Sequence, residues 1–171
     1  MGDGGALSGL RFGILTCSTS RTPADDGSGD ALAEGVQAQG GVVAQRALLP
    51  DDREAIAALL RTWADGGRLD VILTTGGTGL GPHDVTPEAT AAVAERDVPG
   101  LAELLRADGR QATPYAVLSR GRAALRGPTL IVNLPGSPAG ARSGLLVLQP
   151  ILGHAVAIAR GGGHGDGGGR G

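Results

Sequence analysis

The residues whose chemistry is easiest to identify follow a short apolar run. Residues 70–75 (DVILTT) pass directly into Gly76-Gly77-Thr78-Gly79. Glycines in such a loop can adopt positive φ and bring the backbone close to a ligand, so that amide N–H groups and the Thr78 hydroxyl can bind phosphate. A tight turn between a strand and a helix also needs glycine, so the motif alone fits a purely structural turn equally well.

Two other loops carry groups that suit anions. Ser137 stands between Gly136 and Pro138 at the expected start of a helix, where its hydroxyl and the free amides can bind an anion or simply cap the helix. Arg21 lies in the loop after the first apolar run, and its planar guanidinium fork suits phosphate. The chain therefore offers several loops in which an anionic group can bind.

Apolar runs and turn signals predict the elements that position these loops. We expect strands at residues 10–17, 42–50, 70–75, 115–119 (YAVLS) and 129–133. We expect helices at residues 30–39, 51–64, 87–96 and 100–107, and a helix from 138 to 148 that Pro150 separates from a last amphipathic segment ending near residue 160.

Strands that alternate with helices predict an α/β fold, a three-layer α/β/α sandwich with a mostly parallel sheet. Such sheets bind ligands beyond the carboxyl ends of their strands, where the loops 18–29, 76–84 and 135–138 are expected. We expect one domain over residues 10–160, with a flexible N-terminus at 1–9 and a flexible glycine-rich tail at 161–171.

The composition excludes several classes of chemistry. All 15 cationic residues are arginine, which excludes a Schiff-base lysine and the lysine of a Walker-type phosphate loop. The net charge of -2 and the pI near 5.9 provide no basic field for a nucleic acid or an anionic membrane. The single Cys17, expected at a buried strand end, allows neither an internal disulfide nor a cysteine-built zinc site.

The sequence also bears on location. We find no basic segment followed by an apolar run near the N-terminus and no stretch that approaches the roughly 20 apolar residues of a membrane span. A lone thiol fits a reducing compartment. We therefore expect a cytoplasmic protein with no membrane partner.

Four stretches resemble one known family. Residues 74–90 (TTGGTGLGPHDVTPEAT) are very similar to the signature of the MogA, MoaB, gephyrin G-domain and plant Cnx G-domain family. Residues 133–138 (NLPGSP) resemble the loop that closes the active site of that family, and residues 114–120 (PYAVLSR) and 49–52 (LPDD) also fit its pattern. The resemblance covers about residues 10–160.

The resemblance implies a molybdopterin adenylyltransferase, which transfers AMP from ATP to the terminal phosphate of molybdopterin and releases pyrophosphate. Such a transfer joins two anions, so a divalent metal, here Mg²⁺, has to neutralise charge. The resemblance makes Asp51 and Asp84 both the catalytic residues and the metal ligands. The alternative is that Asp84 caps a turn and that Asp51 or Asp52 caps the second helix.

The resemblance further implies a set of residues that bind the substrate or nucleotide. Glu88 is one of them, although a carboxylate in the first turn of a helix gains from the helix dipole in any case. We assign no catalytic role to His83. The expected binding residues are Ser18, Ser28, Gly29, Thr75, Gly76, Gly77, Thr78, Gly79, Glu88, Asn133, Pro135, Gly136 and Ser137.

Two positions depart from the family pattern. Relatives often carry an aspartate where Thr19 stands, and many have a serine near a pterin contact where Gly109 stands. These changes leave open a non-catalytic molybdopterin-binding or regulatory protein. A metal-inserting molybdotransferase is the enzymatic alternative, but such proteins are much longer and their glycine loop differs.

The family also implies partners. Its members assemble as trimers or as dimers of trimers, so we expect a homotrimer or a hexamer. We further expect small-molecule substrates, no nucleic acid, and hand-over of the product to a molybdotransferase.

Overall fold

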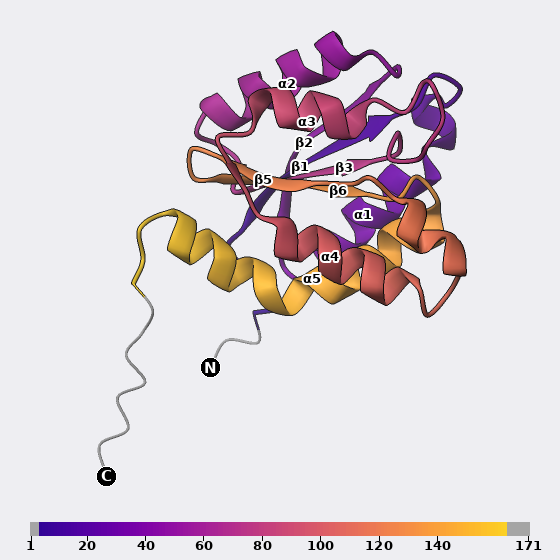
Figure 1. The fold of residues 1–171 in the computed structure, drawn as a ribbon. Coiled ribbons are helices and arrows are strands. Elements are labelled where there is room, and N and C mark those ends of the chain that lie inside the picture. Colours follow the sequence, from indigo (N-terminus) through magenta and orange to yellow (C-terminus); the bar gives the residue numbers. More distant parts are fainter. Residues whose placement is uncertain (1–3, 164–171) are drawn as a thin grey trace.

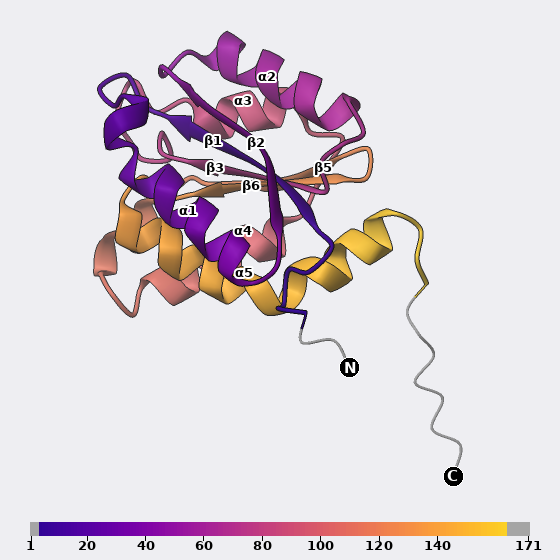
Figure 2. The same cartoon turned by 180° about the vertical axis from the view of Figure 1, so that it is seen from behind.

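The computed structural model describes residues 4–163, which form a six-stranded sheet covered by helices on both faces (Figures 1 and 2). The strands are β1 (Arg11–Cys17), β2 (Val42–Leu49), β3 (Val71–Thr75), β4 (Arg96–Asp97), β5 (Ala123–Arg126) and β6 (Thr129–Leu134). The helices are α1 (Gly27–Ala38), α2 (Arg53–Asp65), α3 (Thr86–Val93), α4 (Pro99–Gly109) and α5 (Pro138–Ala159), with short 3-10 helices η1 (Pro23–Asp25) and η2 (Pro114–Leu118).

The sheet has the strand order β2-β1-β3-β6-β5-β4. The first four strands in this order are parallel, whereas β5 and β4 pair antiparallel at one edge. In the register of the sheet, Thr16 lies beside Thr75 and Thr75 lies beside Leu134. The carboxyl ends of β1, β3 and β6 therefore lie side by side at one edge of the sheet.

Each central strand is buried on both faces, which explains its unbroken apolar run. Along β1, Phe12 and Ile14 pack into a core cluster with α1, α4 and α5, whereas Leu15 and Cys17 pack into a second cluster with α2 and α3. Figure 1 shows the same division, with α2 and α3 above the sheet and α1, α4 and α5 below it. The expected three-layer sandwich is confirmed, as is the buried end of the first strand at Cys17.

Several expected elements were wrong. Residues 115–119 form no strand, because Pro114 opens the helix η2 and the Thr113 hydroxyl accepts a hydrogen bond from the amide of Tyr115, which caps it. The helix at the C-terminal end of the domain is continuous through Pro150, because apolar residues on both sides of the proline, including Leu148 and Leu152, pack into the same core.

Other elements were misplaced or missed. The helix α1 begins at Gly27 rather than at residue 30, because Asp26 caps it by accepting a hydrogen bond from the amide of Gly29. The helix α3 ends at Val93 rather than at residue 96, because the following residues pair as β4 with β5. The strands β4 and β5 are both short, and neither has an apolar run long enough to predict it.

The ends of the chain differ from the expected division. Within the expected flexible N-terminus, residues 4–9 form a turn in which Leu7 is fully buried and its amide donates to the carbonyl of Gln39. The packed domain thus includes residues before Leu10. Of the tail, residues 161–163 are described, and the rest of the expected tail lies outside the described residues.

The helix α5 is, in the described part of the chain, the one helix long and apolar enough to cross a membrane by length and composition alone. No such stretch is expected from the sequence alone. One face of α5, which includes Leu145 and Val156, is buried against the sheet and α1. A core helix has this composition, so α5 gives only weak evidence for a membrane span.

Candidate active site

Three loops meet at the carboxyl edge of the parallel strands. They follow β1, β3 and β6, as the sequence predicts, and direct contacts join them. The Thr75 hydroxyl donates to the carbonyl of Pro135 over 2.6 Å. A Cβ placed on Gly136 would lie 3.1 Å from the Cα of Gly76, so the backbones of these two loops touch. The glycine loop after β3 therefore lies at the centre of the site.

The first two glycines of this loop are required by its shape. Gly76 has φ of +95° and Gly77 has φ of +67°, a region that side chains rarely adopt. A Cβ on Gly76 would lie 2.4 Å from the carbonyl oxygen of Cys17, and one on Gly77 would lie 2.4 Å from Oγ1 of Thr86. The backbone at Gly76 is therefore pressed directly against the end of β1.

Replacement of Gly76 by alanine is expected to destabilise the fold by about 2 kcal/mol more than the equivalent change at Gly67. Gly67 also has a positive φ, of +71°, but a Cβ there would meet no described atom within 4 Å. The pair Gly76→Ala and Gly67→Ala thus separates the steric clash from backbone strain. Urea unfolding measures both, and equal free energies of unfolding would contradict the close approach at Gly76.

Arg21 joins the loop after β1 to the loop after β6. Its guanidinium donates to Oγ of Ser28 over 2.6 Å and to the carbonyl of Gly136 over 2.8 Å. The amide of Arg21 donates to Oγ of Ser18. The structure therefore brings Ser18, Ser28 and Gly136 together through Arg21, whose guanidinium joins the two loops.

Gly29 is held close to a buried acid. Its amide donates to Asp26, and a Cβ on Gly29 would lie 2.1 Å from Oδ2 of that carboxylate. Asp26 also accepts from the hydroxyl of Thr16 and pairs with Arg46. Glycine at position 29 is therefore explained by packing beneath the loop.

Asp51 and Asp52 have different roles in the structure. Asp52 caps α2 by accepting a hydrogen bond from the amide of Ala55, so the capping role falls on this residue. Asp51 instead receives two hydrogen bonds on Oδ2 from Thr19, one from the amide at 3.2 Å and one from the hydroxyl at 3.0 Å. Its side chain is directed to the loops rather than to the helix end.

The other oxygen of Asp51, Oδ1, is one of two buried side-chain nitrogen or oxygen atoms that lack a hydrogen-bond partner among the described residues; the second is Oε2 of Glu88. Oδ1 of Asp51 lies beside the glycine loop, 3.3 Å from the position of a Cβ on Gly77. Burial raises the pKa of the nearby Cys17 thiol to about 12, and the negative charge of Asp51 adds to this effect. A buried, unpaired carboxylate oxygen is a group that a cation can satisfy.

Asp84 lies against the same glycine loop. Its Oδ2 accepts a hydrogen bond of 2.9 Å from the amide of Gly81, and a Cβ on Gly79 would lie 2.8 Å from this oxygen. Asp84 therefore does cap a turn, which was the structural alternative for this residue. The carboxylates of Asp51 and Asp84 nevertheless border one loop, at Gly77 and at Gly79 respectively.

Arg120 fixes this loop and was missed in the sequence. Its guanidinium donates to the carbonyls of Gly79 and Asp84, each over 2.8 Å, and pairs with Glu88. Its amide donates to the carbonyl of Thr78. The hydrogen bond from Arg120 holds the pKa of Glu88 below its usual value. The PYAVLSR stretch contains this arginine, but the pairing spans 32 residues and no local pattern signals it.

Arg120→Met is expected to release the loop, because it removes three hydrogen bonds that a methionine cannot make. Hydrogen exchange at the amides of Gly81 and Asp84, which are hydrogen-bonded within this loop, measures this release. We expect their protection to fall about tenfold, or roughly 1.4 kcal/mol. Arg122→Met is the matched control, because Arg122 makes an exposed ion pair with Asp97. Unchanged exchange in Arg120→Met would refute the clamp.

Other predicted binding residues have structural duties. Asn133 is buried, its amide nitrogen donates to the hydroxyls of Thr74 and Thr90, and its oxygen accepts from the amide of Arg122. Both of its N–H donors are thus used within the fold. The Ser137 hydroxyl caps α5 by accepting from the amide of Gly140.

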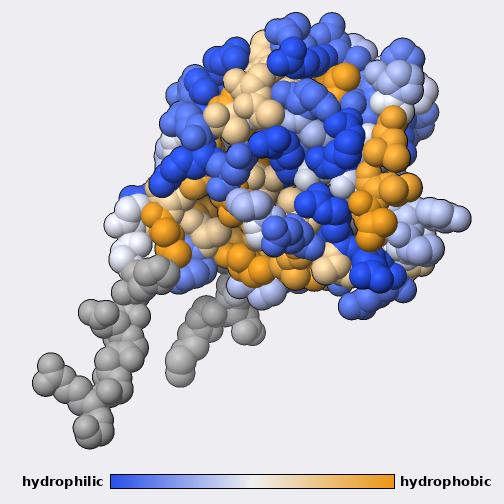
Figure 3. Space-filling view, viewed as in Figure 1, coloured by the Kyte–Doolittle hydropathy of each residue, from blue (hydrophilic) through white to orange (hydrophobic). Residues whose placement is uncertain are grey.

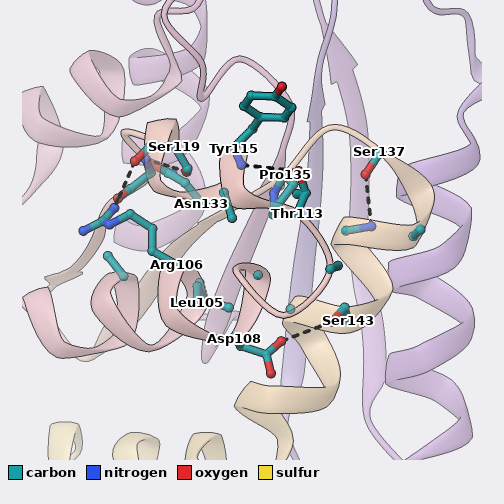
Figure 4. A pocket seen from close by; sticks show the side chains of 18 residues that line it. Leu105, Arg106, Asp108, Thr113, Tyr115, Ser119, Asn133, Pro135, Ser137 and Ser143 are labelled. Carbon is teal, nitrogen blue, oxygen red and sulfur yellow. Dashed lines mark hydrogen bonds between the residues drawn. The ribbon is translucent and has the colours of Figure 1, made fainter.

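A pocket of about 390 Å³ opens on the other side of the 135–137 loop, between α4, η2 and the start of α5 (Figure 4). Asp108 and Ser143 are joined by a hydrogen bond of 3.2 Å between α4 and α5. Gly109 lies in the wall, where it adds no hydroxyl. The labelled lining residues are Leu105, Arg106, Asp108, Thr113, Tyr115, Ser119, Asn133, Pro135, Ser137 and Ser143.

Residues 4–163 contain no group of three His, Cys, Asp or Glu side chains placed to hold a metal ion. Mg²⁺ does not require one, since it often keeps several waters and binds one or two carboxylates together with substrate phosphates. The unpaired Oδ1 of Asp51 is an oxygen that can serve as a ligand to the metal. The residues present therefore fit a magnesium ion that is shared with a phosphate ligand.

Comparison with known proteins gives consistent matches. Residues 13–154 match the family described as "Probable molybdopterin binding domain". The chain is 34% identical over 158 residues to the molybdopterin adenylyltransferase of Helicobacter pylori, and the match covers 86% of each protein. Other curated relatives are longer, and the chain spans only 26%, 51% and 48% of the length of three of them.

Solved structures agree in fold. The molybdopterin biosynthesis enzyme MoaB from Thermus thermophilus has a TM-score of 0.81 and 48% identity, covering 89% of this chain and 97% of that one. The molybdopterin biosynthesis Mog protein from Mycobacterium ulcerans has a TM-score of 0.82 and 37% identity, covering 90% and 99%. The family match over residues 13–154 includes the loops that follow β1, β3 and β6.

Proposed function

This chain belongs to the family of probable molybdopterin-binding domains of molybdenum cofactor biosynthesis, and from this premise we propose that it is a molybdopterin adenylyltransferase. One observation carries the proposal. The buried, unpaired Oδ1 of Asp51 lies beside a glycine loop whose other end borders Asp84. This arrangement suits a phosphate ligand that is bound together with a cation.

The proposed reaction transfers an adenylyl group. An oxygen of the terminal phosphate of molybdopterin forms a bond to the α-phosphorus of ATP, and the bond from that phosphorus to the bridging oxygen of the β-phosphate breaks. Pyrophosphate leaves with the electron pair of that bond, and adenylyl-molybdopterin remains. Because both reactants are anions, positioning and charge compensation carry most of the catalysis.

The residues divide this work. The amide of Gly76 donates to the carbonyl of Leu134, so the amides of residues 77–79 bind phosphate oxygens. Arg120 holds that loop in place. Ser18 and Ser28 lie at the neighbouring loop, where Arg21 fixes them. Asp51 and Asp84 would hold Mg²⁺, which when bound would neutralise charge on the phosphates.

We assign the pterin part of molybdopterin to the pocket of about 390 Å³ between α4 and α5, a volume within the usual range for a small-molecule site. Asp108, Thr113 and Ser143 offer polar groups to the pterin edge. The loop of Pro135 and Ser137 borders both this pocket and the glycine loop, so a molybdopterin seated here can extend its phosphate toward ATP.

We also propose a homotrimer or hexamer that works in the cytoplasm and passes its product to a molybdotransferase. Exposed apolar side chains support contact with further copies. Val117 is 53% exposed, Leu118 47% and Leu80 66%. Figure 3 shows apolar surface along the right-hand edge of the molecule. Sedimentation velocity measures the assembly.

Transfer of label from [α-³²P]ATP to molybdopterin tests the proposed function. With Mg²⁺ and molybdopterin present, we expect labelled adenylyl-molybdopterin, and no labelled product when either is omitted. If the protein binds molybdopterin but no label is transferred, it is a non-catalytic pterin-binding protein. Such a result would implicate Gly109 and Thr19. Gly109 lies in the pocket wall, and Thr19 contacts Asp51.

A further inference from the structure

We infer that Thr19 is a positioning residue that orients the carboxylate of Asp51 so that its Oδ1 is presented to a cation. This inference rests on the proposed function in so far as the cation serves adenylyl transfer. Among the described residues, Thr19 makes no hydrogen bond to the glycine loop. It acts through Asp51 alone.

The two residues form a reciprocal pair across two loops. The Thr19 hydroxyl donates to Oδ2 of Asp51 over 3.0 Å and at the same time accepts from the amide of Asp51 over 3.1 Å. The Thr19 amide donates to the same Oδ2 over 3.2 Å. One hydroxyl thus fixes both the backbone and the side chain of Asp51, as in the reciprocal bonds of a capping box.

This pairing explains why the two carboxylate oxygens differ. Oδ2 receives two hydrogen bonds, so the rotation of the carboxylate group is set. Oδ1 is then held in a buried position beside Gly77, where the described residues offer it no donor. Without Thr19, Asp51 can turn Oδ1 toward water, which removes the cost of leaving it unpaired.

Charge also favours a neutral partner at this position. Threonine supplies a donor without adding a second negative charge beside Asp51. Asp51 is therefore the one charged group of the Thr19–Asp51 pair, and on this side of the glycine loop a bound cation meets one fixed carboxylate.

A purely structural role for Thr19 predicts something different. Thr19 is exposed, so loss of its hydroxyl removes little buried surface. If Thr19 only joined the two loops, its loss would change stability and leave the affinity for a cation unaltered. Cation affinity therefore separates the two roles.

The test compares Thr19→Val, which has nearly the same shape without the hydroxyl, with Thr19→Ser, which restores it. Binding of Mn²⁺ alone to the full chain is followed by the electron paramagnetic resonance signal of the free ion. We expect Thr19→Val to weaken Mn²⁺ binding about tenfold, Thr19→Ser to restore it, and Asp51→Asn to abolish it. Ser20 is a neighbouring exposed residue, and we expect the Ser20→Ala variant to bind Mn²⁺ with the affinity of the unmodified protein.

The same variants are then assayed for pyrophosphate release. We expect Thr19→Val to raise the Mg²⁺ concentration for half-maximal rate about tenfold and to retain most of kcat at saturating Mg²⁺. The inference would be overturned if Thr19→Val bound Mn²⁺ as tightly as the unmodified protein does. It would also be overturned if the unmodified protein bound no Mn²⁺. Weaker Mn²⁺ binding in Thr19→Val without any pyrophosphate release in the unmodified protein would refute the proposed function and leave this inference standing.

Discussion

Asp51→Asn is expected to lower the rate of pyrophosphate release by a factor of about 10²–10³, the usual loss when one electrostatic contact to the reacting group is removed. Asparagine keeps the size of the side chain and an oxygen that can accept from Thr19, so the fold is retained. It removes the negative charge next to the glycine loop. The measurement is kcat with saturating ATP, Mg²⁺ and molybdopterin.

The neighbouring residue provides the control for this prediction. Asp52 caps α2, and asparagine caps helices as well as aspartate does, so Asp52→Asn is expected to keep both activity and stability. Asp51 and Asp52 are neighbours in the sequence, but we expect only Asp51 to be needed for activity. Equal losses of activity in Asp51→Asn and Asp52→Asn would contradict the assignment of the cation to Asp51.

Asp84→Asn is expected to lower pyrophosphate release about a hundredfold while molybdopterin binding persists. The carbonyl of asparagine can still accept from the amide of Gly81, so the turn is kept and only the charge is lost. Molybdopterin binding is followed by fluorescence titration and turnover by pyrophosphate release.

Asp97→Asn is the matched control for Asp84→Asn, because Asp97 makes an exposed ion pair with Arg122. We expect this variant to be fully active. Unchanged turnover in Asp84→Asn would show that capping the turn is the only role of Asp84.

The sequence predicted the parts of the fold that depend on local pattern. The strands β1, β3 and β6 are buried on both faces, so their apolar runs are continuous and end where polar loops begin. Parallel strands bring their carboxyl ends together, which placed three loops at one edge. The centre of the site was therefore accessible from the order of the elements alone.

Features that depend on distant contacts were not predictable. The short strands β4 and β5 exist through pairing with each other and with β6, and η2 depends on a proline and a threonine cap. The clamp by Arg120 joins residues far apart in the chain. The pocket beside α4 forms only when three separate elements meet.

The choice between capping and metal binding also needed the structure. Both carboxylates of the LPDD stretch precede a helix, so either could serve as its cap. The structure gives the cap to Asp52 and leaves one oxygen of Asp51 buried, with no partner in the described part of the chain. For Asp84, a capping hydrogen bond and a position at the glycine loop occur together.

The central claim is that this chain catalyses adenylyl transfer to molybdopterin. The most direct measurement is pyrophosphate release from ATP and Mg²⁺ by the purified protein, with and without molybdopterin. We predict release that requires molybdopterin and that nearly disappears in Asp51→Asn. Absence of release from a protein that binds molybdopterin tightly would contradict the claim.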